Sequence, residues 1–99
     1  MIYEIAKILV KDGEEEGFKL ALNEAKKVIS QSGGFLGIEF TQGIETPNEF
    51  ILLIQWETLE DHTIGFRESD LFVKWRAIIG PFFKEAPVVF HYNPFNNSL

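Results

Sequence analysis

Apolar side chains recur along this chain with two different periods. Four segments are rich in β-branched and aromatic residues and are bounded by turn residues, which is typical of β-strands. Two longer segments between them place apolar residues three and four positions apart, which predicts amphipathic helices. The predicted strands are residues 2–10, 35–41, 49–57 and 88–92. The predicted helices are residues 14–31, a short helix over 58–66, and a second helical piece that begins at Ser69 and ends at Gly80-Pro81.

The expected helix starts carry capping signals. Asp12 followed by Glu15 fits a capping box ahead of the first helix, and Thr58 with Asp61 fits a second one. Ser69 can cap the last helical piece through its hydroxyl group. These signals fix where we expect each helix to begin.

The order of the elements is β-α-β-β-α-β, which predicts an α+β, ferredoxin-like fold. In this arrangement an antiparallel four-stranded sheet carries both helices on one face. The turn-rich link over residues 42–48 is expected to join two strands as a hairpin. The length of 99 residues allows a single domain, which we place at residues 1–93, with residues 94–99 as an irregular C-terminal tail.

The predicted strands are apolar on both faces. Successive strand residues point to opposite sides, so Ile5, Leu9, Ile51 and Leu53 form a second apolar face behind the first. Two helices can cover only one face of a sheet. A homodimer that packs sheet against sheet is the simplest cover for the second face, because symmetric pairs are the commonest oligomers. Alternatively, the loop over residues 81–87 and the C-terminal tail fold across it.

Composition narrows the class of protein. Apolar residues make up 45% of the chain, which excludes a disordered chain, and no apolar run approaches the roughly 20 residues of a membrane span. The net charge of −6 argues against binding to nucleic acid or to anionic membranes. The absence of cysteine and of a leader-like N-terminal pattern is consistent with a cytoplasmic location.

Several short runs occur in a characteristic order along the chain. They are Gly33-Gly34-Phe35-Leu36-Gly37, then Trp56-Glu57-Thr58-Leu59-Glu60-Asp61-His62, the single residues Phe66, Ser69 and Phe72, then Gly80-Pro81-Phe82, and finally His91-Tyr92. This combination resembles the antibiotic biosynthesis monooxygenase family. The resemblance implies a dimeric α-β barrel with a pocket between sheet and helices in each subunit. It also implies oxidation of quinols or polyphenolic aromatic molecules by O₂ without metal or flavin.

Other members of this family degrade haem, and that branch can be tested on residues. It uses an Asn on the first strand, a Trp at the end of the short helix and a His ligand on the next helix. Here residues 2–10 contain no Asn, Phe66 stands at the Trp position and Arg76 stands at the His position. The sequence therefore disfavours haem degradation.

Oxygenation without a cofactor needs an apolar pocket, a base that deprotonates the substrate, and donors that hold the resulting anion. The residues predicted to bind substrate are Trp56, Phe66, Arg67, Phe72, Trp75 and Ile79. Alternatively, the apolar members of this set are ordinary core residues.

Two histidines are the catalytic candidates. His62 is the preferred base because an unperturbed imidazole titrates near neutral pH, and His91 is the second candidate. Alternatively, His62 is an exposed helix residue and His91 lies at a dimer interface. Glu39 and Arg67 either hold a substrate group or form an ion pair.

No cofactor site is expected. The two histidines are far apart in the sequence and lack metal-ligand spacing, and no glycine-rich loop joins a strand to a helix as a phosphate site requires. The sequence favours a monooxygenase that acts on a small aromatic molecule without a cofactor. The alternatives are a non-enzymatic module that binds or senses a small molecule, and an isomerase or lyase on the same scaffold.

Overall fold

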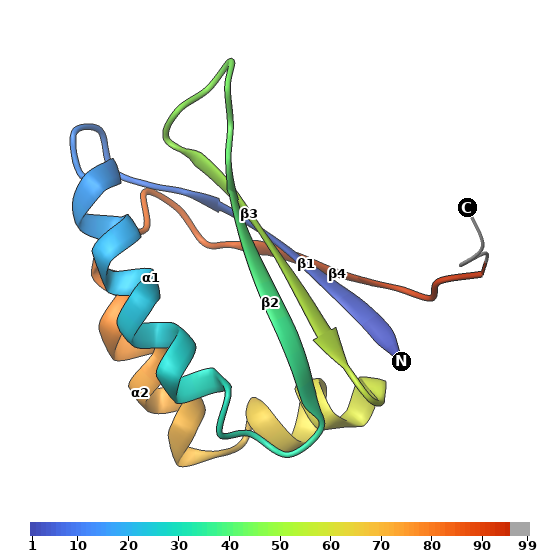
Figure 1. Cartoon of the computed structure of the whole chain (residues 1–99). Coiled ribbons are helices and arrows are strands. Elements are labelled where there is room, and N and C mark those ends of the chain that lie inside the picture. The colour runs from blue at the N-terminus through green and yellow to red at the C-terminus, as the bar shows by residue number, and fades with distance from the viewer. Residues whose placement is uncertain (96–99) are drawn as a thin grey trace.

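A four-stranded antiparallel sheet carries both helices on one of its faces (Figure 1). The computed structural model describes residues 1–95, so part of the predicted tail, residues 96–99, lies outside the described residues. The elements are β1 (Ile2–Leu9), α1 (Glu15–Ile29), β2 (Phe35–Gln42), β3 (Glu49–Trp56), the π-helical segment η1 (Asp61–Phe66), α2 (Asp70–Ile79), the short 3₁₀ turn η2 (Gly80–Phe82) and β4 (Val88–Tyr92). The strand order is β2-β3-β1-β4. The predicted ferredoxin-like α+β fold is confirmed.

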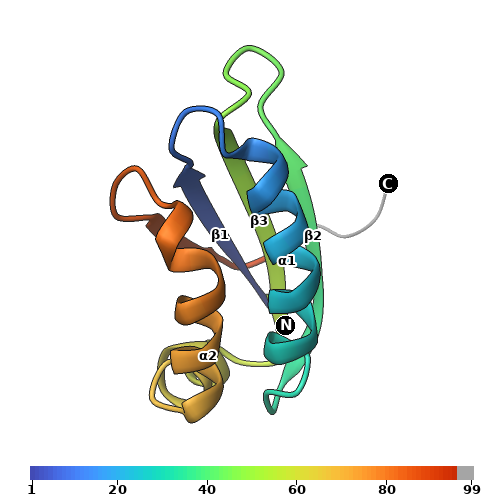
Figure 2. The ribbon, with the colours of Figure 1, turned by 90° about the vertical axis from the view of Figure 1, so that its left-hand side faces the viewer.

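The helices α1 and α2 lie next to each other across the inner face of the sheet (Figure 2). The periodic residues of α1 are its buried ones, namely Phe18, Leu22, Ala25 and Ile29. Phe18 packs edge-on against Phe50 of β3, with ring centroids 4.9 Å apart. This aromatic contact fixes α1 to the middle of the sheet. Among residues 1–95 no helix is both long enough and apolar enough to cross a bilayer.

Two of the three predicted caps are present. The Thr58 hydroxyl accepts the backbone N–H of Asp61 at 3.2 Å, and the Asp61 carboxylate accepts the backbone N–H of Thr58 at 3.1 Å. The Ser69 hydroxyl accepts the backbone N–H of Phe72 at the start of α2. These caps fix both ends of the segment that carries η1.

The predicted capping box of Asp12 and Glu15 is wrong. α1 begins after Glu14, and no side chain caps it. Gly13 has a φ of +84°, which turns the chain, and its N–H donates to the Glu15 carboxylate at 2.7 Å. Asp12 points instead toward Lys84, with an oxygen-to-nitrogen distance of 3.8 Å.

The segment η1 is wound more loosely than an α-helix. The backbone N–H of Arg67 donates to the carbonyl of His62, five residues earlier, at 3.0 Å. Both His62 and Phe66 are directed into the interior. Gly34 has a φ of +80°, and a Cβ there would overlap the Asp61 carboxyl group. The loop before β2 therefore packs tightly against the start of η1 and helps to fix the position of His62.

The outer face of the sheet carries no helix in the part of the chain that the structure describes (Figure 1). Leu53, Ile5 and Phe90 form one row across three strands of this face, and Phe90 is 60% exposed. In the loop between η2 and β4, Phe83 and Pro87 line a hollow on the inner side of the sheet together with Ala6 and Ile8 of β1. The alternative that this loop covers the outer face is therefore wrong.

Candidate functional site

A single carboxylate lies in the otherwise apolar row of residues that β1 directs toward the inner side of the sheet. Glu4 of β1 is directly opposite His91 of β4 on one side and Ile54 of β3 on the other. The next inward residues of β1, Ala6 and Ile8, belong to the core. Glu4 itself is only 5% exposed. A buried carboxylate is costly unless it is hydrogen-bonded or neutral, so its surroundings determine what it can do.

Glu4 belongs to a chain of polar contacts that runs from Trp56 to His91. The indole N–H of Trp56 donates to Glu4 Oε1 at 2.9 Å. His62 Nε2 lies 3.3 Å from the same oxygen, and His62 Nδ1 lies 2.8 Å from His91 Nε2. His62 also stacks on the Trp56 ring, with centroids 5.5 Å apart. Four side chains from β1, β3, η1 and β4 are thus in contact in one row.

Burial changes the proton affinity of Glu4. Desolvation raises the pKa of Glu4 from 4.5 to about 7, although the Trp56 hydrogen bond and the positive charge of Arg67 both lower it. A carboxylate with a pKa near 7 can accept a proton at neutral pH and release it again. Ordinary surface carboxylates are too weakly basic to do this efficiently.

The two histidines shift in the opposite direction. Desolvation, followed by the charges of Arg67 and His91, lowers the pKa of His62 from 6.5 to about 4. Desolvation and the Arg67 charge also lower the pKa of His91. His62 is therefore neutral at pH 7. When Glu4 is ionised, the His62 tautomer that fits both contacts carries its proton on Nε2, beside Glu4. Its Nδ1 then accepts a hydrogen bond from His91.

Two histidines and a carboxylate are also the ligand types of a non-haem iron site. Here His62 turns one ring nitrogen toward Glu4 and the other toward His91, so the three groups form a chain and do not point at a common centre. Within residues 1–95 no group of three or more His, Cys, Asp or Glu side chains is arranged to hold a metal ion. The geometry of this cluster suits proton transfer better than metal binding.

A cavity of about 320 Å³ adjoins the cluster, between the sheet and the α2 side of the molecule. Its volume lies in the range of small-molecule sites. Phe66, Phe72 and Trp75 form an aromatic wall, in which Phe66 meets Phe72 and Trp75 edge-on. Glu4 and His62 supply polar groups to the same cavity. A flat aromatic ligand fits such a lining because it can stack on the rings while its polar group meets Glu4.

The structure brings most of the predicted site residues together. Those that line the cavity are His62, Phe66, Arg67, Phe72, Trp75 and Ile79. Trp56 does not line it; this buried side chain donates to Glu4, which does. His91 touches His62 rather than the cavity. His62 is only 3% exposed, so the alternative of an exposed helix residue is wrong.

The structure places Glu39 and Arg67 on opposite sides of the sheet. Glu39 is paired with Leu53 and belongs to the outer face, whereas Arg67 lines the inner cavity. The two side chains therefore do not form an ion pair.

Glu4 is not among the site residues predicted from the sequence. The signal was available, because residues 2, 6, 8 and 10 of the first strand are apolar and share one face with Glu4. A carboxylate within such a row predicts either a buried functional group or a break in the core. Which of the two applies depends on Trp56 and His62, which lie far away in the sequence.

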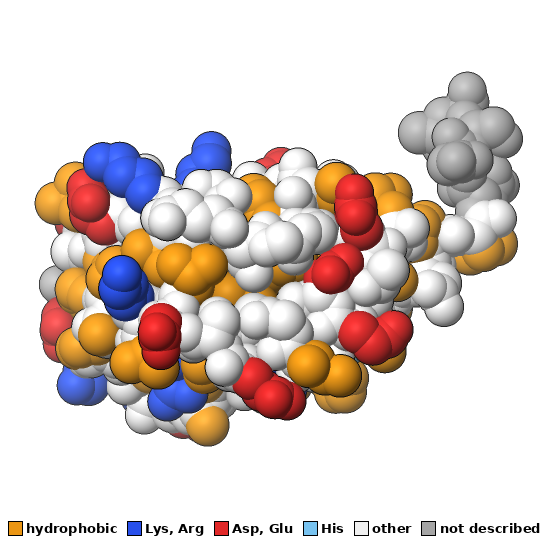
Figure 3. Space-filling model, turned by 90° about the horizontal axis from the view of Figure 1, so that it is seen from below, with side chains coloured by type: hydrophobic (Ala, Val, Ile, Leu, Met, Phe, Trp, Pro, Cys, Tyr) orange, Lys and Arg blue, Asp and Glu red, His pale blue; other side chains and the backbone are white. Residues whose placement is uncertain are grey.

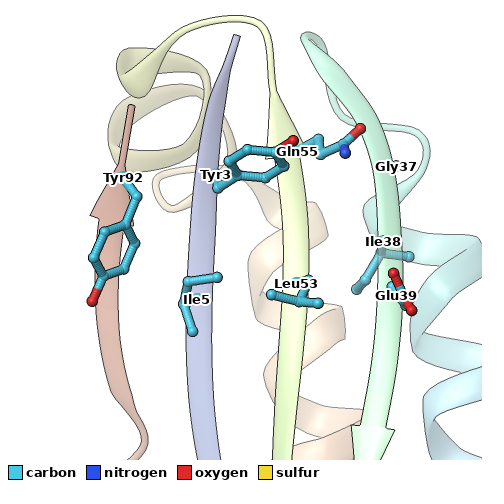
Figure 4. A pocket seen from close by; sticks show the side chains of 8 residues that line it. All are labelled: Tyr3, Ile5, Gly37, Ile38, Glu39, Leu53, Gln55 and Tyr92. Atoms are coloured by element: carbon cyan, nitrogen blue, oxygen red, sulfur yellow. The ribbon is translucent and has the colours of Figure 1, made fainter. Parts of the chain in front are cut away.

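A second hollow, of about 780 Å³, lies on the outer face of the sheet (Figure 4). It is open, and its lining comes from all four strands, including Tyr3, Gln55, Glu39 and Tyr92. Figure 4 shows these side chains spread over the sheet rather than converging on one point. We therefore place the candidate active site in the inner cavity.

The raised pKa of Glu4 predicts a specific pH dependence of stability. Glu4→Gln keeps an acceptor for Trp56 but cannot ionise. Because the folded-state pKa of Glu4 lies above its ordinary 4.5, the wild type loses stability relative to this variant as the pH rises from about 4.5 to about 7. Over this window the free energy of unfolding of the wild type falls by roughly 3 kcal/mol relative to that of Glu4→Gln. Urea denaturation across the pH range measures it.

Two features of this experiment isolate Glu4. His62 contributes an opposite slope, because its lowered pKa makes stability fall as the pH falls from 6.5 to about 4, and both proteins retain it. Glu39→Gln makes the same chemical change on the outer face and serves as the control. If the difference in the free energy of unfolding between the wild type and Glu4→Gln does not change with pH, the raised pKa of Glu4 is contradicted.

Comparison with known proteins places the fold in a family. The antibiotic biosynthesis monooxygenase family model matches residues 1–78. The uncharacterized protein YczJ of Bacillus subtilis (strain 168) is 36% identical over 92 residues, which cover 93% of this chain and 97% of that protein.

Two solved structures have the same architecture. A Bordetella bronchiseptica protein that carries the antibiotic biosynthesis monooxygenase name superposes with a TM-score of 0.93 at 35% identity, covering 96% of this chain and 97% of that one. SnoaB from Streptomyces nogalater, an oxygenase, superposes with a TM-score of 0.81 at 8% identity, covering 97% and 94%. This chain belongs to the antibiotic biosynthesis monooxygenase family.

Proposed function

We propose that this protein is a cofactor-independent monooxygenase that oxidises a hydroxylated aromatic small molecule. The observation that carries the proposal is Glu4, a buried carboxylate at the wall of an aromatic cavity, with a pKa of about 7. The family match supports an oxygenase. SnoaB, which shares the fold, is called a cofactor-independent oxygenase, and this supports the cofactor-free form of the reaction.

The first step is removal of a proton from a substrate hydroxyl group. The substrate ring stacks on the aromatic wall of the cavity and directs its hydroxyl toward Glu4, which accepts the proton. The positive charge of Arg67 acts on this end of the cavity, since it shifts the pKa of both Glu4 and His62. The same charge stabilises the substrate anion as it forms.

The second step uses the electron-rich anion itself as the reductant. It passes one electron to O₂, and the resulting substrate radical and superoxide combine to form a carbon–oxygen bond. The peroxide that results loses water and leaves a new carbonyl group on the substrate. One oxygen atom enters the product, the other leaves as water, and all four electrons come from the substrate. The balance therefore needs no external reductant.

The histidines connect Glu4 with the outside. Once Glu4 has taken the substrate proton, the relay uses the other His62 tautomer, with the proton on Nδ1. His62 Nε2 then accepts the Glu4 proton while the Nδ1 proton passes to Nε2 of His91, which is half-buried at the edge strand β4. Because burial keeps His62 neutral, it can accept a proton at one ring nitrogen while releasing one from the other. His62 therefore acts as a relay and Glu4 acts as the base.

Oxygen uptake tests the reaction. The protein is incubated with a panel of hydroquinones, naphthols and polyphenols while dissolved O₂ is recorded. We expect uptake with at least one compound, and a loss of about 10²- to 10⁴-fold in kcat/KM for Glu4→Gln because the base is removed. Glu39→Gln, which changes a carboxylate on the outer face, keeps the wild-type rate.

The pH profile adds a second readout to the same experiment. The wild-type kcat/KM rises with pH through about 7, because Glu4 must be ionised to accept the proton. Glu4→Gln lacks this inflection. Uptake that is absent with every compound, or equal in Glu4→Gln and the wild type, contradicts the proposed function.

We also propose that the protein is a homodimer joined through the outer faces of the two sheets. The row of Leu53, Ile5 and Phe90 provides the apolar centre of this face. A sheet of four strands about 4.8 Å apart and up to eight residues long has a face of roughly 500 Å². Two such faces bury about 1,000 Å², which is the smallest area expected of a biological interface.

Sedimentation tests the dimer. The wild type is expected at twice the chain mass of 11.4 kDa at low micromolar concentration. Leu53→Arg introduces a charge at the centre of the face and shifts the protein to monomer. Val73→Arg, on the solvent side of α2, is the control and stays dimeric. A monomeric wild type contradicts the dimer.

A further inference from the structure

The chain has two arginines, Arg67 and Arg76, and both line the inner cavity. None of its seven lysines does so. Glu4 is the only carboxylate among the lining residues. In a chain with a net charge of −6, the arginine charge is therefore concentrated at one small-molecule cavity.

Neither arginine forms an ion pair with a carboxylate of the described residues. Within residues 1–95 the cations that lie within 4.0 Å of a carboxylate, apart from His62, are Lys7, Lys19, Lys27 and Lys84. Carboxylates are nevertheless abundant on the surface, as the space-filling view shows on the side next to the C-terminal segment (Figure 3). Both guanidinium groups therefore remain available to a ligand.

The position of Arg76 leaves its donor groups accessible. Its guanidinium carbon lies 5.8 Å from the centroid of the Phe72 ring, which is part of the aromatic wall. A guanidinium that stacks on an aromatic face keeps its N–H groups at the edge, where they can bind a carboxylate with two parallel hydrogen bonds. A ligand ring next to Phe72 brings its own substituent to this edge.

The two arginines lie at different points along the cavity. Arg67 follows η1, whose His62 touches Glu4. The far end of α2 leads into η2, where the Phe82 carbonyl accepts the backbone N–H of Lys11, just beyond β1. Thus α2 runs alongside β1, away from Glu4. Arg76 is six residues past the start of α2, about 9 Å along the helix axis.

We propose that Arg76 selects aromatic substrates that carry a carboxylate on the side of the ring system away from the reacting hydroxyl. The inference rests on the proposed function for the position of that hydroxyl at Glu4. It adds the class of substrate: a hydroxylated aromatic acid, bound between the Glu4 end of the cavity and the Arg76 guanidinium.

The charge of the cavity supports an anion over a neutral ligand. Arg67 and Arg76 each add a fixed positive charge, whereas Glu4 is the only group that opposes them. Both arginines are exposed to solvent, which screens their charge, so we expect a moderate preference and not an absolute one.

Binding of a matched pair of probes tests this inference. A hydroxynaphthoic acid and its methyl ester have the same ring system and differ in the anionic group. Their dissociation constants are measured by calorimetry under nitrogen, so that no turnover is needed. The wild type is expected to bind the acid about tenfold or more tightly than the ester.

Two variants identify the residue responsible. Arg76→Gln is expected to remove the preference for the acid while the affinity for the ester stays within about twofold. Lys74→Gln removes one positive charge from an exposed position on the same helix and keeps the preference. Circular dichroism confirms that each variant is folded.

The outcomes separate this inference from the proposed function. Equal binding of acid and ester by the wild type, or an equal loss of both in Arg76→Gln, overturns the role of Arg76. If neutral aromatics support oxygen uptake and acid and ester bind equally, the oxygenase proposal holds and only the preference for a carboxylate is contradicted. Preference for the acid without any oxygen uptake supports Arg76 and contradicts the oxygenase.

Discussion

The burial of one carboxylate on the apolar face of the sheet is the constraint on which the site depends. Burial makes the ionised form of Glu4 less favourable, and this raises the pKa of its carboxyl group to about 7. Its shortest hydrogen bond comes from the indole N–H of Trp56, which is itself fully buried at the end of β3. Near neutral pH the buried Glu4 is therefore divided between its protonated and its ionised form. This allows it to act as a base.

The neighbouring elements hold this group in contact with the cavity. The caps at Thr58 and Ser69 fix the ends of the segment that carries η1, and the wide turn of η1 directs His62 and Phe66 inward together. His62 then links Glu4 to His91 across the sheet. Arg67 and Arg76 supply positive charge on the helix side, so a single small cavity has an aromatic wall, a base, a proton relay and cationic groups.

The sequence predicted the fold better than the site. Runs of β-branched and aromatic residues located the four strands, and helical spacing of apolar residues located α1 and α2, because these signals are local in the chain. The cavity residues from Phe66 to Ile79 were found because they lie close together in the sequence, at the end of η1 and along α2. Glu4 was missed and His62 was given its role, because the contact between them joins residues far apart in the chain and depends on which face of β1 is buried. The start of α1 also differed, since the Gly13 turn took the place of the Asp12 cap.

The protonation state of Glu4 is the quantity that tests this account most directly. The carbon-13 chemical shift of the Glu4 carboxyl group, measured from pH 3 to pH 9 in protein labelled at glutamate, reports it without a substrate. The resonance is assigned by its absence in Glu4→Gln. The account predicts a titration midpoint near pH 7. A midpoint near the ordinary 4.5 contradicts it, because Glu4 would then be a permanently ionised and weak base.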